Sequence, residues 1–302
     1  MKKYSIKDIE RMTGIKAHTI RMWEKRYDTV TPNRTDTNIR FYTDADMKRL
    51  INIASLNQLG YKISYLSKLD DQELARLTLS LMVKPSLTDE GDINNMMQAI
   101  LIYDNALMER QLNNQLLKYG IEKSFKNVIA PFTENLYYLY RSGVIAFSQF
   151  YFARYVIAQK IIAATDQLPQ PNGKESCVLF TLDYREKEME LIYYNYLLRK
   201  RDVKVYYFGQ PLMLDDLKYV CQNVNPTLLI EALFETRDQS IIHSHIKILN
   251  EACPDQNIWI QAKTILDDKK SIPSNVTYFS SVQDIIEKIS ADFPHNEMGF
   301  PL

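Results

Sequence analysis

The first 27 residues contain two short amphipathic segments separated by a glycine, and this order constrains the fold of the N-terminal region. Ser5 can cap a helix, and Asp8 stands three positions further on, where a carboxylate suits the free amides and the positive helix end. Gly14 supplies the left-handed residue that ends such a helix. The apolar stripe of the first segment is Ile6, Ile9 and Met12. The sequence therefore predicts a helix of about two turns, a turn at Gly14 and a second helix.

The second segment has one apolar face, and its other positions are mostly cationic. Ile20 and Trp23 recur at spacing three, which places both on one side of a helix. The other positions carry Lys16, His18, Thr19, Arg21, Lys25 and Arg26. An exposed helix with such side chains can enter the major groove of DNA, where arginine serves either phosphates or guanine edges. The sequence does not separate these two roles.

A polar loop and a short strand follow the second helix. Residues 31–38 are rich in Pro, Asn, Thr and Asp, which is typical of a loop, and residues 39–42 have the pattern of a strand. Arg40 and Tyr42 fall on one side of this strand, so we expect them to bind phosphate oxygens beside the groove. Thr43 predicts the cap of a third helix, whose buried stripe is Met47, Leu50, Ile51 and Ala54. The whole order predicts a winged helix-turn-helix.

The charges of the chain are divided between its two ends. The 37 basic and 37 acidic side chains give a net charge of zero, yet residues 1–69 contain fourteen basic and seven acidic side chains. This segment carries +7 and the remaining 233 residues carry −7. A positive head on an acidic body is typical of a protein that neutralises phosphates at one end. The alternative is a solvated basic domain without a DNA role, which the order of helices and wing disfavours.

These N-terminal motifs resemble the DNA-binding head of the MerR family of bacterial transcription regulators. The resemblance lies in Tyr4–Glu10, in Thr19-Ile20-Arg21 followed by Trp23-Glu24, and in Arg40-Phe41-Tyr42. It implies a homodimer on a near-palindromic site of double-stranded promoter DNA, which such regulators twist or bend so that RNA polymerase, a further partner, can or cannot engage. The DNA-binding residues that we expect are Lys16, His18, Thr19, Arg21, Arg26, Tyr27, Arg34, Asn38, Arg40 and Tyr42.

The rest of the 302-residue chain is long enough for two further folded domains. We expect a head at 1–75, a linker at 76–92, a four-helix bundle at 93–168, a flavodoxin-like domain at 175–292 and a tail at 293–302. The bundle helices are predicted at 93–103, 104–118, 121–141 and 146–166. Strands predicted at 176–181, 203–208, 227–232, 257–261 and 276–279 alternate with helices at 186–201, 213–223, 238–252 and 281–290. The fold class is therefore mainly α plus α/β, with a five-stranded parallel sheet.

Composition excludes some classes of protein. No apolar stretch approaches the length of a membrane span, and the N-terminus lacks a signal core, so we expect a cytoplasmic protein without a membrane partner. Cys177, Cys221 and Cys253 are scattered single cysteines, which favours buried reduced thiols over a disulfide framework or a Cys-x-x-Cys metal site. His243 and His245 stand two apart on a predicted helix, which turns their rings apart and makes a metal site improbable.

The body resembles one subgroup of the MerR family. After Gly60 the helical pattern breaks, with no long heptad run for a coiled coil. The order that follows is similar to regulators with a helical bundle and a cobalamin-binding domain, including light-responsive repressors of carotenoid genes. The resemblance implies an acidic residue, a cobalt-ligating His and a Gly in the loop after the first strand, where this chain has Asp183, Lys187 and Glu190. A protonated lysine cannot ligate cobalt.

The other positions that the resemblance assigns to cobalamin are also replaced. The fourth strand runs into Gln261 without a glycine pair for the nucleotide tail, and the family's upper-face Trp and Glu-His pair fall on Tyr140, Phe150 and Tyr151. We therefore expect no cofactor and no metal. The body is then either a scaffold for dimerisation and partner contacts, which we favour, or a pocket rebuilt for another small molecule with Asp183, Arg185, Lys187 and the bundle aromatics.

Enzyme classes fit less well. A corrinoid methyltransferase module shares the bundle and the flavodoxin-like domain but requires the axial histidine. A phosphoacceptor receiver domain needs an acidic cluster, an acceptor aspartate and a lysine. Asp183, Glu231 and Lys263 match this pattern only loosely, because Glu231 stands where the acceptor aspartate is needed. The sequence has no glycine-rich phosphate loop, no nucleophile elbow and no metal motif. We expect no catalytic residues.

Overall fold

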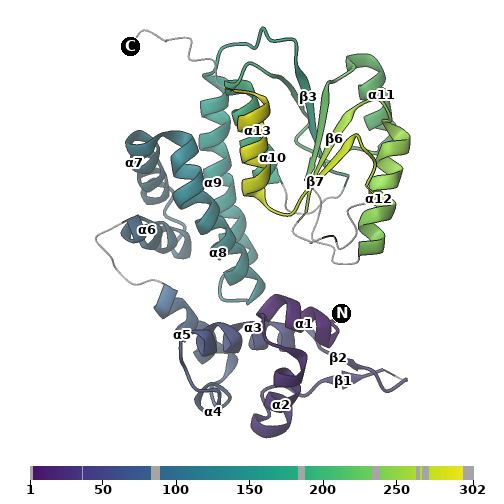
Figure 1. Cartoon of the computed structure of the whole chain (residues 1–302). Coiled ribbons are helices and arrows are strands. Elements are labelled where there is room, and N and C mark those ends of the chain that lie inside the picture. Colours follow the sequence, from purple (N-terminus) through teal and green to yellow (C-terminus); the bar gives the residue numbers. More distant parts are fainter. Residues whose placement is uncertain are drawn as a thin grey trace. The chain divides into compact units, whose positions relative to one another are not determined.

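The computed structural model of the chain (Figure 1) describes residues 3–35, 37–82, 89–182, 188–232, 239–262, 266 and 272–294. The chain divides into two compact units, residues 1–157 and 158–302. This boundary lies within one long helix, whereas the sequence predicts a boundary at the polar segment 168–174. The apolar pattern of that helix runs on without a break, so composition gives no signal there. No helix in the described ranges combines the length and apolar character needed to cross a membrane.

The N-terminal domain is a helix-turn-helix followed by a small hairpin and a third helix. Its elements are α1 (Ile6–Thr13), α2 (Ala17–Tyr27), β1 (Asn33–Arg34), β2 (Arg40–Phe41), α3 (Asp44–Gln58) and α4 (Ile63–Leu66). Ser5 and Thr43 form reciprocal capping boxes with Asp8 and Asp46, so α1 and α3 each begin where the sequence predicts. Gly14 ends α1 with φ 71°. β1 and β2 pair antiparallel and form the wing.

Two apolar clusters hold the N-terminal domain together. Ile9 of α1 and Ile20 of α2 pack with Tyr42, Leu50 and their neighbours in the first cluster. The second cluster joins Trp23 of α2 to Ile53, Leu56, Leu66 and Leu74. Burying an aliphatic side chain of this size stabilises a fold by about 1.5–3 kcal/mol. The apolar stripe of α2 is therefore fixed against α1 and α3, and its opposite side is left to solvent.

The predicted linker at 76–92 is wrong over its first part, because α5 spans Asp71–Met82. Asp70 and Glu73 cap this helix reciprocally, with the Glu73 amide donating to Asp70 Oδ1 at 2.7 Å and the Asp70 amide donating to Glu73 Oε2 at 2.9 Å. Leu77 and Leu81 then pack on the cluster around Trp23, which extends the helix beyond residue 75. Residues 83–88 lie outside the described residues.

The helical bundle follows as α6 (Asp89–Leu101), α7 (Asn105–Ser124), η1 (Phe125–Ile129), α8 (Ala130–Arg141) and α9 (Phe147–Asp166). Gly120 takes non-helical angles, φ 73° and ψ 170°, and breaks α7 near the predicted end of the second bundle helix. The π-type turn η1 stands directly before Pro131. Because proline has no amide hydrogen, the turn before it is a place where helical hydrogen bonding changes register.

The third helix of the N-terminal domain also contacts α8 and its end. The buried Asn52 donates from Nδ2 to the carbonyl oxygen of Ser142 at 3.2 Å. The hydroxyl groups of Ser55 and Tyr138 share a hydrogen bond of 2.6 Å. The Asn52 amide nitrogen and the Ser55 hydroxyl group thus find partners in the bundle, whereas Asn52 Oδ1 has none among the described residues.

The C-terminal unit contains a parallel sheet, as the sequence predicts. Its strands are β3 (Ser176–Phe180), β4 (Lys204–Tyr207), β5 (Leu228–Ala232), β6 (Asn257–Gln261) and β7 (Val276–Phe279), all paired parallel in the order β4-β3-β5-β6-β7. The helices are α10 (Glu188–Lys200), α11 (Leu214–Val224), α12 (Gln239–Ala252) and α13 (Val282–Asp292). Two of them, α11 and α12, pack on one face through an apolar cluster, and α10 and α13 lie together by the sheet (Figure 1). Helices on both faces explain why β5 is buried at every position.

Candidate nucleic-acid interface

The outer face of α2 carries a row of basic side chains that make little contact with the domain. His18, Arg21 and Arg26 are exposed, and the side chain of Lys16 is 73% exposed. Ile20 and Trp23, by contrast, are 1% and 4% exposed. Lys25 also lies in the last turn of α2, where a cation suits the negative helix end. The predicted division of this helix into an apolar side and a cationic side is therefore present.

Two predicted residues of α2 are half-buried. Thr19 lies close to the buried stripe, and Tyr27 packs its ring on the cluster around Trp23. The Arg26 guanidinium lies 5.6 Å from the centre of the Tyr27 ring, within the range of a cation–π contact. The Tyr27 ring therefore positions the Arg26 guanidinium at the end of the helix, and part of the ring stays exposed to solvent.

The start of α2 is fixed by a glutamate from α1. Lys16 stands at the N-cap without a side-chain capping bond. The Ala17 amide instead donates to Glu10 Oε2 at 3.2 Å, and Lys16 Nζ lies 3.3 Å from Glu10 Oε1. One carboxylate thus satisfies an open amide and orients the first cation of the helix. Sequence reasoning missed Glu10, because its partners lie beyond the turn.

The wing places two of the predicted residues beside each other. Arg34 Nη1 donates to Asn38 Oδ1 at 2.7 Å and to the Asn38 carbonyl at 3.3 Å. Both residues are exposed, and Asn38 has a left-handed φ of 64°, which asparagine adopts more readily than most residues. The hairpin therefore carries an arginine whose direction is set by its own turn.

The structure corrects the expectation for Tyr42. Its ring is wholly buried, and its hydroxyl donates a short hydrogen bond to Glu24 of α2. Burial and the Glu24 carboxylate both raise the pKa of the Tyr42 hydroxyl. Arg40 lies on the same side of the strand, as predicted, with Nε 3.7 Å from Glu24 Oε2 and a side chain that is 38% exposed. The side shared by Arg40 and Tyr42 faces α2, so Tyr42 anchors the wing and Arg40 reaches solvent from its edge.

Glu24 is the organising residue that sequence reasoning missed. Its side chain is 8% exposed and accepts from Tyr42 while facing Arg40. A signal existed in the sequence, since Glu24 stands four residues after Ile20 and one after Trp23, on the buried side of the helix. A carboxylate in such a place needs partners, and the nearest candidates are the cation and phenol of the wing.

The residues assigned to a degenerate cofactor pocket fall in three places. Asp183, Arg185 and Lys187 lie outside the described residues. Glu190 is in the first turn of α10, beside the buried Tyr194, whose pKa is raised by burial and by this carboxylate. In the bundle the Tyr140 and Phe150 rings stack at 4.9 Å, and Tyr151 meets the edge of Phe150 at 5.2 Å. These rings pack on one another, with Phe150 buried and Tyr151 38% exposed.

Ligands of a parallel α/β sheet bind at the carboxyl ends of its strands, where a corrinoid would therefore lie. Gln261, at the position where the resemblance implies a glycine pair, is wholly buried. Glu231 at the end of β5 is also wholly buried and lies 2.8 Å from His245 Nε2 of α12. No three His, Cys, Asp or Glu side chains of the described ranges are grouped to hold a metal.

Comparisons with known proteins agree with the N-terminal geometry. A sequence model of the family described as MerR HTH family regulatory protein matches residues 4–73. The HTH-type transcriptional repressor CarH of Myxococcus xanthus is 25% identical over 256 residues, which are 83% of this chain and 85% of the relative. The HTH-type transcriptional regulator MlrA of Escherichia coli (strain K12) is 32% identical over 73 residues, which are 24% of this chain and 30% of the relative.

Among solved structures, the chain is similar to the monomethylamine corrinoid protein of Methanosarcina barkeri, with 10% identity and a TM-score of 0.47 over 68% of this chain and 99% of that one. The cationic helix, the wing and the sequence relatives lead to one conclusion for the N-terminal region. Residues 4–73 form a MerR-type helix-turn-helix domain, which is joined to a helical bundle and a parallel α/β domain in a chain that is similar to HTH-type transcriptional regulators.

Proposed function

We propose that the protein binds duplex promoter DNA as a homodimer, with α2 in the major groove and the wing on the adjacent phosphates. The observation that carries this proposal is the exposed cationic row of α2, set on a helix whose other side is buried at Ile20 and Trp23. His18, Arg21 and Arg26 project from one rigid helix, so they keep a fixed spacing without the DNA. Arg34 and Arg40 add cations from the hairpin.

Rigid cations of this kind bind nucleic acid by releasing counterions. Each phosphate that a Lys or Arg neutralises adds about one unit to the slope of log affinity against log salt. A side chain that reads a base edge behaves differently, because its loss weakens binding at one base pair and relaxes specificity there. The salt slope therefore separates the two roles for each arginine.

The test is a titration of labelled operator DNA with the Arg21→Ala variant at several salt concentrations. We expect weaker binding, with the salt slope reduced by about one unit if Arg21 contacts phosphate. The matched control is Lys247→Ala, which removes a side chain that is 77% exposed on α12 and should leave the affinity unchanged. If Arg21→Ala bound like the parent protein at every salt concentration, the assignment of α2 to the groove would fail.

Dimerisation follows from the size of the head. One small DNA-binding module makes few base contacts, and symmetric regulators gain selectivity by placing two heads on half-sites about one helical turn apart. Light scattering on the protein as it elutes from a size-exclusion column should give twice the mass of the 35.4 kDa chain. Footprinting should then show two protected half-sites, and a monomer that protects one site with full affinity would contradict the proposal.

Our proposal includes regulation that does not require cobalamin. Support comes from the buried Gln261, from the closed Glu231–His245 pair and from the mutual packing of the bundle aromatics. Lys187 replaces the expected axial histidine in the sequence. We expect neither adenosylcobalamin nor methylcobalamin to bind in a calorimetric titration, and DNA affinity should be equal with and without them. A stoichiometric complex would overturn this part of the proposal and leave the DNA assignment standing.

A further inference from the structure

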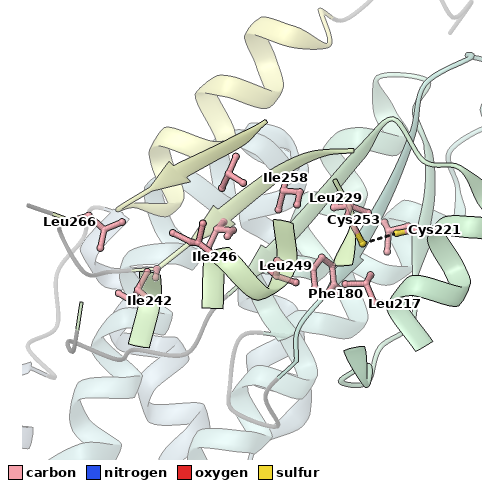
Figure 2. Packing of buried hydrophobic residues seen from close by; sticks show 14 residues of the cluster. Phe180, Leu217, Cys221, Leu229, Ile242, Ile246, Leu249, Cys253, Ile258 and Leu266 are labelled. Atoms are coloured by element: carbon pink, nitrogen blue, oxygen red, sulfur yellow. Dashed lines mark hydrogen bonds between the residues drawn. The ribbon is translucent and has the colours of Figure 1, made fainter. Parts of the chain in front are cut away.

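Two of the three cysteines of the chain lie against each other in the C-terminal unit. Cys221 is in the last turn of α11, and Cys253 follows the end of α12 directly. Their sulfur atoms are 3.4 Å apart, and Figure 2 shows the two thiols facing each other beside Leu217, Leu229 and Leu249. Both side chains belong to the apolar cluster that joins α11 and α12 to the sheet.

The surroundings of this pair limit its chemistry. No third metal-ligating side chain joins it among the described residues, so a tetrahedral metal site is not formed. The third cysteine, Cys177, is wholly buried in β3, and its thiol lies 3.7 Å from the carbonyl oxygen of Val178. A disulfide needs sulfur atoms about 2 Å apart, so the two sulfur atoms would have to move closer than their 3.4 Å separation.

We propose that Cys221 and Cys253 form a redox modification site, at which hydrogen peroxide converts the dithiol into a disulfide that joins α11 to the end of α12. The proposal goes beyond DNA binding and does not depend on it. The geometry that carries it is the 3.4 Å contact between two side chains whose sequence positions are 32 residues apart.

The reaction balances without a further reactant. The thiolate of one cysteine attacks a peroxide oxygen, an S–O bond forms, the O–O bond breaks, and one water leaves after protonation of the released hydroxide. The second sulfur then attacks the sulfenic acid, an S–S bond forms, and the S–O oxygen leaves as a second water. Two thiols are oxidised by two electrons, and one peroxide is reduced to two waters.

The environment selects Cys253 as the first nucleophile. The hydrogen bond shared with the Cys221 thiol lowers the pKa of Cys253, burial opposes this, and the charge of Lys218 on α11 lowers it further. The pKa of Cys221 is raised by its bond to Cys253 and by burial. Cys221, which is 7% exposed, is the side from which a small oxidant reaches the pair, whereas Cys253 is 1% exposed. Bulky alkylating reagents should therefore react slowly with the folded protein.

The experiment treats the full-length reduced protein with hydrogen peroxide, removes the oxidant, unfolds the protein and alkylates the remaining thiols. We expect one alkyl group for each chain, on Cys177, and a peptide pair linked through Cys221 and Cys253 in the mass spectrum. Dithiothreitol should restore three alkylated thiols. The oxidised protein should also melt at a higher temperature, because the link closes a loop in the unfolded chain.

Three alkylated thiols after peroxide, or oxygen added to Cys221 and Cys253 without a linked peptide, would overturn the proposal. The control variant Cys177→Ala should still form the link. Cys221→Ser should instead leave Cys253 as a sulfenic acid that dimedone traps. If either variant fails to fold, the mass measurement on the parent protein still decides, since it needs no substitution and no DNA.

Discussion

Polar side chains gather in two regions of this protein, and the two regions treat them differently. On α2 of the N-terminal domain the cations His18, Arg21 and Arg26 are exposed, and the one buried carboxylate, Glu24, has Tyr42 and Arg40 beside it. At the ends of β5 and β6, Glu231 and Gln261 are wholly buried. Glu231 has one partner, His245, and neither side-chain atom of Gln261 has a hydrogen-bond partner in the described chain.

This difference in burial determines how each region can take part in function. Charges on the surface of a rigid helix stay hydrated and cost little to keep, so they remain available to a polyanion. Buried polar groups need partners at all times, and losing one partner costs as much as the group's desolvation. The N-terminal face is therefore open to binding, whereas Glu231 at the end of β5 is committed to its pair with His245.

The largest predicted effect is the loss of the buried pair. His245→Ala leaves the buried carboxyl group of Glu231 without its partner, and we expect the C-terminal unit to lose about 3 kcal/mol of unfolding free energy. Urea unfolding of this unit can be followed by Trp259 in a Trp23→Phe background, because the chain has two tryptophans, one in each unit.

The matched control is His243→Ala on the same helix. Nδ1 of His243 lies 2.7 Å from the carbonyl oxygen of Gln239 one turn earlier, and the ring is half-buried. Its loss should cost less than about 1 kcal/mol. Equal losses of unfolding free energy for the two histidine variants would mean that the buried pair stabilises the unit no more than an ordinary contact does.

The same pair predicts a pH dependence. Burial lowers the pKa of His245, but the hydrogen bond and the charge of Glu231 raise it more, so the net shift is upward. A group whose folded pKa lies above its unfolded value contributes its full stability below about pH 6.5 and loses it as pH rises through the folded value. Urea midpoints for the C-terminal unit should therefore fall from about pH 6 to about pH 9. In Glu231→Gln this fall should be smaller, and an unchanged profile would contradict the pairing.

A smaller effect is expected for the buried anchor of the wing. Tyr42→Phe removes the donor to Glu24, whose side chain is 8% exposed, and should cost the N-terminal domain about 2 kcal/mol. Trp23 in a Trp259→Phe background reports this unfolding. The salt slope of DNA binding should stay constant, because the hydroxyl faces α2 and not the solvent. Tyr65→Phe is the control, since Tyr65 is 50% exposed. A lower salt slope of DNA binding with unchanged stability would mean that the Tyr42 hydroxyl contacts a phosphate after all.

Local features of the fold could be predicted from the sequence. The capping boxes of Ser5 and Thr43 involve residues three apart, and short-range signals of this kind are independent of tertiary context. The five strands were predicted because each is a short apolar run between turn residues, as expected for a parallel sheet buried on both faces. The cationic side of α2 was predicted from its period alone.

Contacts between distant residues were not predictable in the same way. The alternation of the wing strand gives the shared side of Arg40 and Tyr42, but the direction of that side depends on where α2 lies. Glu231 and His245 are 14 residues apart in the sequence and meet because α12 returns over β5. Cys221 and Cys253 were interpreted as scattered single cysteines for the same reason.

The smallest predicted effect concerns the backbone that sets the direction of α2. Gly14 has φ 71°, and a Cβ there would lie 3.7 Å from Gln58 Nε2, so Gly14→Ala meets no steric clash and pays only for the left-handed conformation. We expect a loss of about 1 kcal/mol, seen through Trp23. Asp28 ends α2 with φ 50°, and Asp28→Gly should give a gain of up to about 1 kcal/mol for the converse reason. Neither residue is among the expected DNA contacts, so both variants should bind DNA with the parent's salt slope under conditions where they are folded. A changed salt slope in Gly14→Ala would show that the turn sets how deeply the cationic row enters the groove. DNA binding by α2 would then depend on the backbone conformation at Gly14 as well as on exposed charge.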